Sequence, residues 1–191
     1  MITPLPIDGS GALILDSILR SAVDATGAAN GWIVVRSNGS LFVAAVMADS
    51  DLRQLRGTIV SSASSAGFCM ASGEPAARQP RPDDSTAADA AGYRGVPSTL
   101  LTVPCVDDEH GTVGVLELAE KSGSAFSLDD VELVSLLANV AGTVIATASG
   151  GNADEVTAPT ELAAELTRLY GTDRRRYTLI ANTVLALLGS G

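Results

Sequence analysis

The sequence is poor in the residue types on which most metal and catalytic sites depend. Its 191 residues include one histidine, His110, and two cysteines, Cys69 and Cys105. A zinc site or a catalytic triad needs several such side chains converging in a cleft, whereas His110 follows the acidic residues 107–109 in a predicted turn. Two cysteines are also too few for the disulfide framework of a secreted protein. We therefore expect no metal site and a solvated turn histidine.

Basic residues are scarce as well. Twelve lysines and arginines stand against 22 acidic residues, which gives a net charge of -10. Such a surface repels phosphate backbones, so we expect no nucleic acid partner. The first ten residues lack the basic start of a signal peptide. No apolar run approaches the roughly 20 residues that span a bilayer, so we expect a soluble, cytoplasmic protein without membrane contact.

The remaining composition is that of a folded protein, because 46% of the residues are hydrophobic. Residues 1–10 form a Pro/Gly-containing lead-in, in which Asp8 or Ser10 is the candidate N-cap of a first helix. The Gly/Asn/Asp-rich stretch 149–158 predicts a linker. We expect one domain over 11–148 and a separate tail over 159–191.

The first part of the domain predicts a helix followed by a β-hairpin. Apolar residues recur at helical spacing over residues 13–25, and Gly27 can end that helix. The β-rich runs 31–36 and 41–47 flank the pair Asn38-Gly39, which is a strong tight-turn signal.

The second part predicts a short helix, a long loop, a second hairpin and a long helix. Residues 49–62 are polar and predict irregular structure, whereas 61–72 predicts a short helix. The segment 79–97 is rich in proline and glycine and predicts a long loop, a kind of segment that often carries function. The hairpin is expected over 97–121 and the helix over 127–148, where Ser127 and Asp130 form a capping box.

The tail predicts two short amphipathic helices separated by Gly171. Two such helices cannot bury their apolar faces alone, so they must dock on something. A run of three arginines at 174–176 lies at the start of the second helix, where the helix dipole disfavours cations. We assign partner binding to one set of tail residues: Leu166, Leu169, Arg175, Tyr177, Ile180, Val184 and Leu188.

Several motifs in this order resemble the GAF domain family, as found in small bacterial GAF-containing proteins. The segment 71–75 is similar to the family's Ser-Gly-Glu-Pro turn, 98–104 to its Leu-Leu-x-Val-Pro strand, and 114–118 to its Gly-Val-Leu-x-Leu strand. The resemblance covers residues 11–148. It implies an α+β fold in which an antiparallel sheet carries helices on one face and a ligand pocket under loops on the other.

A further similarity concerns the Asn-Lys-Phe-Asp-Glu signature of cyclic-nucleotide-binding members. Lys121, Phe126 and Asp130 match it, but Glu120 stands where asparagine is expected. We interpret these residues as structural: a Lys121–Asp130 ion pair ties the last strand to the helix start, and Phe126 fills the gap. No histidine or Cys-His pair falls in the pocket that the resemblance implies, where haem or bilin would need one, so we expect no cofactor.

The resemblance also implies where a ligand would bind. Phe68, Cys69, Arg94 and Ser98 lie near the expected pocket mouth and are our candidate ligand-binding residues. The segment 67–71 is similar to the cysteine segment of GAF-type free methionine sulfoxide reductases, although this chain has no cysteine in the long loop. Cys105 is expected in a strand as part of the core.

Three functions therefore stay open. The leading expectation is a non-enzymatic regulatory or adaptor protein that works through protein–protein interaction, as a homodimer or with a partner protein on the C-terminal helices. The helices 11–26 and 127–148 often pair between copies in such domains. The alternatives are a small-molecule sensor whose output lies in a partner chain, and a free methionine sulfoxide reductase. No kinase, phosphodiesterase or DNA-binding segment was found, so we expect the output to come from another chain.

Overall fold

A computed structural model of the chain describes residues 7, 9–48, 53–80, 96–149, 174 and 178. The chain divides into two compact units, Met1–Ser149 and Gly150–Gly191. In the second unit, Arg174 and Thr178 are helical and exposed, and the Thr178 hydroxyl donates to the Arg174 carbonyl over 2.8 Å. All of the tail residues assigned to partner binding lie outside the described residues, as does Arg94.

The first unit is built on a six-stranded antiparallel sheet with the order β3-β2-β1-β6-β5-β4. The central strands are long because their residues are mostly β-branched or apolar on both faces. The strand bounds are β1 Ala28–Ser37, β2 Ser40–Met47, β3 Ile59–Val60, β4 Ala76–Arg78, β5 Leu100–Asp107 and β6 Gly111–Lys121.

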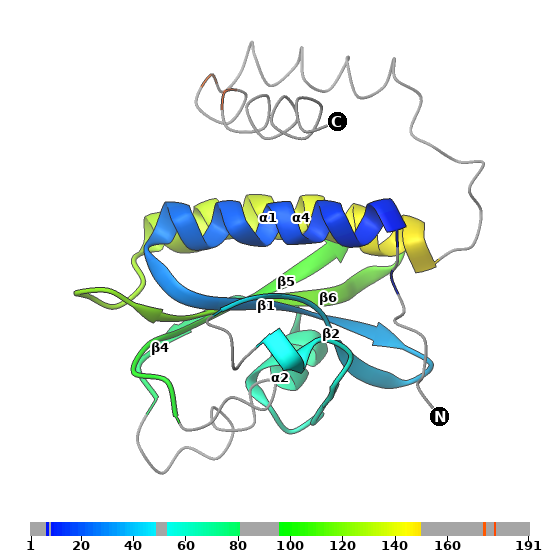
Figure 1. Cartoon of the computed structure of the whole chain (residues 1–191), viewed down its shortest axis with the longest axis horizontal. Coiled ribbons are helices and arrows are strands. Elements are labelled where there is room, and N and C mark those ends of the chain that lie inside the picture. The colour runs from blue at the N-terminus through cyan, green and yellow to red at the C-terminus, as the bar shows by residue number, and fades with distance from the viewer. Residues whose placement is uncertain are drawn as a thin grey trace. The chain divides into compact units, whose positions relative to one another are not determined.

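Two long helices, α1 (Gly9–Thr26) and α4 (Leu128–Ser149), lie side by side on one face of the sheet (Figure 1). Small residues let both helices approach the sheet closely. A Cβ at Gly142 of α4 would lie 2.2 Å from the Val106 carbonyl oxygen of β5, and a Cβ at Gly31 of β1 would lie 3.0 Å from Leu19 Cδ1 of α1. The apolar side chains between these helices and the sheet, which include Leu15, Leu19, Leu116 and Ile145, are buried.

The short helix α2 (Ser65–Ser72) and the 3₁₀ turn η1 (Arg53–Leu55) lie on the other side of the sheet (Figure 1). The layer between α2 and the sheet is a second apolar cluster, which includes Trp32, Val34, Leu100, Met70 and Val115. The fold is therefore the expected α+β arrangement, with helices on one face and α2 with its loops on the other.

The predicted turns are confirmed at residues that adopt positive φ. Asn38 and Gly39 have φ values of 49° and 78° and join β1 to β2. Gly27 has a φ of 71° and ends α1, and Gly73 has a φ of 69° and ends α2. Glycine, and to a lesser degree asparagine, tolerates this region of backbone conformation.

The capping box of the last helix is also confirmed. Ser127 Oγ accepts from the Asp130 backbone N–H at 3.2 Å, and the Asp130 carboxylate accepts from the Ser127 backbone N–H at 2.7 Å. This reciprocal pair satisfies two backbone donors at the start of α4.

Three local predictions are wrong. Residues 49–62 include the turn η1 and the short strand β3, not only irregular structure, and β4 was not predicted. Both strands are edge strands of two or three residues, too short to show an alternating pattern. Ser10 is not an N-cap, because α1 begins at Gly9, and Asp8 lies outside the described residues.

The expectation of no membrane-length apolar run is also corrected. Within the described part of the chain, residues 128–148 form one helix that is long and apolar enough to cross a membrane. Its inward face, which includes Val134, Ala138, Ala141 and Ile145, is buried in the domain. An apolar core helix passes the same test of length and composition, so this helix is weak evidence for a membrane contact.

Candidate functional site

The α2-facing side of the sheet contains a buried carboxylate, Glu117. Because side chains alternate along a strand, Val115, Glu117 and Ala119 of β6 face α2, whereas Leu116 and Leu118 face α1 and α4. The pairing register places Glu117 between Trp32 of β1 and Thr102 of β5.

Both neighbours donate a hydrogen bond to Glu117. The Trp32 indole Nε1–H donates to Oε2 over 2.6 Å, and the Thr102 hydroxyl donates to Oε1 over 3.2 Å. Both donors are uncharged, and Glu117 has 0% of its surface exposed. Burial raises the pKa of Glu117 to about 7, although the bonds from Trp32 and Thr102 and the charge of Arg78 act in the opposite direction.

Helix α2 packs over this carboxylate and is fixed at both ends. The Ser64 side chain caps its start by accepting from the Gly67 N–H at 3.2 Å, and the Gly73 N–H donates to the Cys69 carbonyl at 2.9 Å. A Cβ at Gly67 would lie 2.2 Å from the Ser62 carbonyl oxygen, so only glycine fits there. Arg78 of the edge strand β4 donates to the Ser65 hydroxyl and so ties that strand to the first turn of α2.

The two cysteines lie on opposite faces of the sheet. Cys69 belongs to α2 and to the cluster beneath it, and its thiol donates to the Glu74 carbonyl over 3.4 Å. Cys105 pairs with Gly114 of β6. A Cβ at Gly114 would lie 2.7 Å from Ile145 Cδ1 of α4, so this pair faces the long helices. Both thiols are free and buried, as expected for Cys105.

Neither thiol is activated. Burial, and secondarily the charge of Glu117, raises the pKa of Cys69 to about 12. Burial also raises the pKa of Cys105. Because the thiolate is the nucleophile, a thiol with a raised pKa is a poor attacking group.

The candidate ligand residues fall in different surroundings. Phe68 is 58% exposed on α2, next to the buried Cys69. Ser98 lies two residues before β5, and there its backbone N–H donates to Glu120 Oε1 at 3.1 Å and its hydroxyl donates to Oε2. Their ligand-binding role stays a prediction.

Sequence reasoning missed the Glu117 cluster, although an acidic residue in the middle of the apolar run 114–119 was a usable signal.

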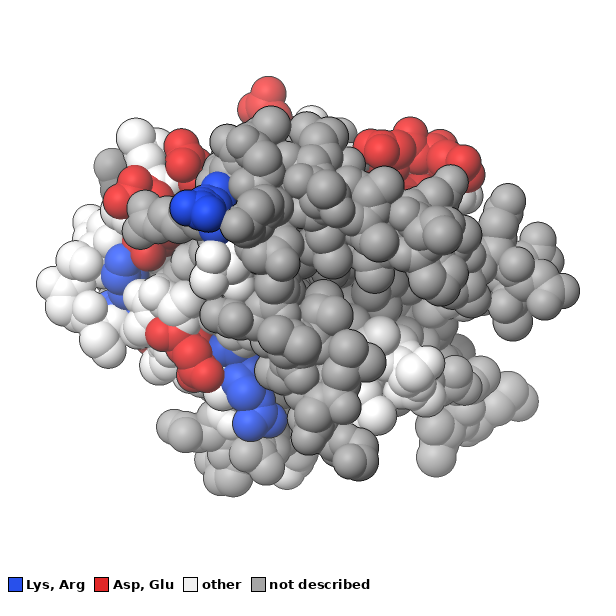
Figure 2. Space-filling model, turned by 90° about the horizontal axis from the view of Figure 1, so that it is seen from above, with Lys and Arg blue, Asp and Glu red and all other residues white. Residues whose placement is uncertain are grey.

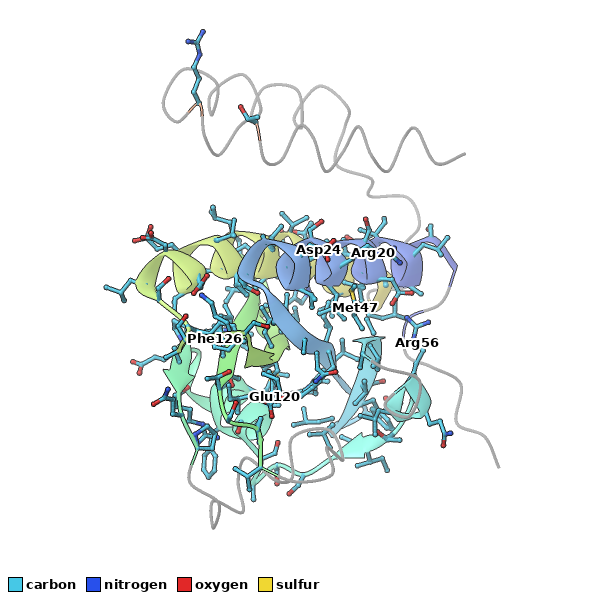
Figure 3. All side chains as sticks on the ribbon, turned by 60° about the vertical axis from the view of Figure 1, so that its left-hand side comes forward. Arg20, Asp24, Met47, Arg56, Glu120 and Phe126 are labelled. Carbon is cyan, nitrogen blue, oxygen red and sulfur yellow. The ribbon has the colours of Figure 1, made fainter. Side chains whose placement is uncertain are left out.

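The signature at the end of β6 is structural, as predicted. Lys121 pairs with Asp130, and both side chains are largely buried. The Lys121 ammonium also lies 5.8 Å from the centre of the Phe126 ring, which is itself buried beneath the start of α4 (Figure 3). Glu120, which replaces the expected asparagine, adopts a φ of 58° and binds Ser98. These contacts tie β6 to α4 and to the segment that precedes β5.

His110 is a solvated turn residue, as expected. Its Nδ1 lies 2.6 Å from Asp107 Oδ1 in the exposed turn between β5 and β6. Among the residues that the structure describes, no group of three or more histidine, cysteine, aspartate or glutamate side chains could hold a metal ion.

Acidic residues dominate the charged positions of the helix layer. Helix α4 carries Asp129, Asp130 and Glu132 and has no lysine or arginine. Figure 2, viewed over this side of the molecule, shows several acidic groups and few basic ones among the described residues.

Comparisons with known proteins agree with this architecture. Residues 13–146 match a family model described as GAF domain. No curated protein matches the chain. The GAF domain of an Acinetobacter phosphoenolpyruvate-protein phosphotransferase has a TM-score of 0.64 at 20% identity, over 77% of this chain and 89% of that one. The second GAF domain of DevS from Mycobacterium smegmatis has a TM-score of 0.58 at 16% identity, over 74% and 96%.

A solved enzyme also shares the fold. The type II free methionine-R-sulfoxide reductase from Thermoplasma acidophilum has a TM-score of 0.58 at 11% identity, over 72% of this chain and 93% of that chain. At these identities, the likenesses concern the fold alone.

Proposed function

The chain belongs to the GAF domain family, and we propose that it is a non-enzymatic regulatory protein that acts by binding another protein chain, which carries the output. The observation that carries the proposal is a pair of exposed apolar side chains, one on each of the two long helices. Leu13 of α1 is 70% exposed and Val140 of α4 is 40% exposed. The start of α1 lies beside the end of α4, because a Cβ at Gly11 would be 3.7 Å from Ala148 Cβ. Both apolar side chains therefore lie in the same half of the helix pair.

The charge of this surface defines the partner that fits it. Helix α4 has three acidic residues and no basic one, and α1 adds Asp16 and Asp24 against Arg20. A protein surface that is apolar in the middle and basic at its rim complements these helices. A different protein meets this requirement, whereas a second copy of this chain would set acidic helices against acidic helices.

A double substitution tests the surface. We expect L13D/V140D to weaken assembly at least tenfold, because it places two charges in the apolar part of the contact. Ile59→Asp is the matched control, since Ile59 is also exposed, at 72%, but lies on the edge strand β3. Native mass spectrometry of protein purified from its own host gives the partner's mass, and circular dichroism checks folding. Assembly that survives L13D/V140D would contradict this surface.

The tail is tested separately. We expect deletion of residues 153–191 to abolish assembly while the first unit keeps its melting temperature. If the deletion leaves the complex intact, the tail residues assigned to partner binding have no such role.

A small-molecule sensor is the second candidate, and the buried Glu117 cluster favours it. Polar side chains converging at the base of an apolar layer are typical of ligand sites. A ligand would appear in native mass spectrometry as a discrete non-covalent mass, and its addition would raise the melting temperature by mass action. Gently purified protein without such a mass would count against this candidate.

The reductase alternative receives little support from the thiols. Reduction of a sulfoxide needs an attacking thiolate and a resolving thiol within reach. The pKa of Cys69 is raised to about 12, and Cys105 faces α4 on the other side of the sheet. We expect no turnover of free methionine sulfoxide. Turnover that disappears in Cys69→Ser would contradict the non-enzymatic assignment.

A further inference from the structure

Glu117 has a setting that a purely structural carboxylate seldom has. Within the described residues, it is the acidic side chain with no exposed surface. The next most buried one, Asp130, is paired with Lys121. The hydrogen bonds that Glu117 accepts come from the neutral donors Trp32 and Thr102. An ionised carboxylate in such a place is more costly than a protonated one.

The groups that face Glu117 come from four elements. Trp32 on β1 and Thr102 on β5 donate to it, Cys69 on α2 lies over it as a neutral thiol, and Arg78 on β4 contributes a positive charge. Arg78 is also bonded to Ser65 at the start of α2. The helix above the carboxylate is short, since α2 has eight residues.

From this geometry we infer that Glu117 is a proton-operated switch: its protonated carboxyl keeps α2 seated on the sheet, and release of the proton to water loosens this helix. An ionised Glu117 gains hydration if α2 moves away, because α2 packs over this part of the sheet. If the protein is a small-molecule sensor, its ligand would bind on this side of the sheet, so the switch would regulate ligand binding. That regulatory role rests on the proposed function, whereas the titration of Glu117 does not.

The direction of the switch follows from the two states. With α2 seated, the pKa of Glu117 is raised to about 7 by burial, whereas a hydrated carboxylate returns toward its ordinary value of 4.5. Between these pH values the seated state holds a proton that the open state releases. A rise in pH therefore favours opening, by up to roughly two orders of magnitude in the equilibrium constant.

The chain contains its own reporter for the protonation. Trp32 is the single tryptophan, and its Nε1–H donates directly to Glu117. The indole ¹H–¹⁵N resonance should therefore be one signal that titrates near neutral pH. In Glu117→Gln, which keeps the shape of the side chain, the same signal should stay fixed.

The loosening of α2 is measured at Cys69, with Cys105 on the other face of the sheet as the internal control. Alkylation by N-ethylmaleimide is followed by mass spectrometry on the full-length protein. Because alkylation itself accelerates with pH, each rate is divided by the rate in Glu117→Gln at the same pH. We expect this ratio for Cys69 to rise about tenfold between pH 6 and pH 8 while the ratio for Cys105 stays constant.

A Trp32 resonance that stays fixed from about pH 5 to pH 9 overturns the inference, and so does a flat ratio for Cys69. If Glu117→Gln does not fold, hydrogen exchange of the wild-type protein replaces the ratio. Protection of α2, corrected for intrinsic exchange, should then fall more than that of β1 as the pH rises, and an equal change in both overturns the switch. Partner binding and its loss in L13D/V140D are measured by native mass spectrometry, independently of the Trp32 and Cys69 measurements. The proposed function and the Glu117 switch can therefore fail separately.

Discussion

Trp32 and Glu117 face each other directly across β1 and β6, and the indole donates to the carboxylate over 2.6 Å. This pair puts the tryptophan of the chain beside the most deeply buried acid among the described residues. Since the carboxylate lies beneath α2 and accepts from two neutral donors, its protonation links local packing to pH.

The first prediction concerns the stability of Glu117→Gln. Below the ordinary pKa of 4.5, the folded and unfolded states are both protonated, so Glu117 carries no penalty. As the pH rises toward about 7, the unfolded state loses its proton first and folding stability falls. Above that pH the penalty is complete, and its upper limit is about 3 kcal/mol. Glutamine removes this penalty.

We therefore expect Glu117→Gln to be more stable than wild type at pH 8, by about 1 to 3 kcal/mol, and not at pH 4.5. Urea denaturation at several pH values measures the difference. Glu132→Gln, at an exposed position of α4, is the control and should change stability little at either pH. An equal effect of Glu117→Gln at both pH values would argue against the raised pKa.

The second prediction uses Thr102 to shift the titration. The Thr102 hydroxyl donates to the ionised carboxylate and lowers its pKa against the effect of burial. Thr102→Val keeps the shape but removes the donor, so the midpoint of the Trp32 resonance should move to higher pH. Thr143→Val, on the exposed face of α4, should leave the midpoint unchanged. A midpoint that moves to lower pH in Thr102→Val would mean that the bond favours the protonated form.

The turns and caps of this fold could be predicted because their signals are local. Asn38 and Gly39 adopt the positive φ values that a tight hairpin needs, and Ser127 and Asp130 make the capping box that their spacing predicts. The Lys121–Asp130 pair was also foreseen, because both residues belong to a familiar motif.

The Glu117 cluster could not be predicted in the same way. Trp32 is 85 residues from Glu117 in the sequence, and only the register between β1, β5 and β6 brings Trp32, Thr102 and Glu117 together. The short edge strands β3 and β4 were missed for a related reason. Each exists through its pairing with a longer neighbour and not through a pattern of its own.

The third prediction concerns the ion pair at the start of α4. Burial raises the pKa of Asp130, but the bonds from Lys121 and Ser127 outweigh it, so the net pKa is lowered. An acid with a lowered pKa stabilises the fold above its unfolded pKa, and this stability is lost as the pH falls through the folded value. We expect Asp130→Asn to cost about 1 to 3 kcal/mol at pH 7 and much less at pH 3.

Asp129→Asn is the matched control for this prediction. Asp129 is exposed in the same first turn of α4, so its substitution removes a charge from the helix start without removing the ion pair. Chemical denaturation of both variants at the two pH values separates the effects. If Asp129→Asn costs as much as Asp130→Asn, the stability comes from the helix dipole and not from Lys121.

The last prediction concerns the close approach of α4 to the sheet. Alanine usually stabilises a helix by about 1 kcal/mol relative to glycine. At Gly142, however, a Cβ would lie 2.2 Å from the Val106 carbonyl oxygen, which is backbone and cannot rotate away. Gly142→Ala must therefore push α4 off β5, and we expect a loss of about 2 kcal/mol or more, measured by urea denaturation. Asn139→Ala, exposed on the same helix, should be neutral or stabilising. A stabilised Gly142→Ala would mean that α4 and β5 are not held at this distance in solution.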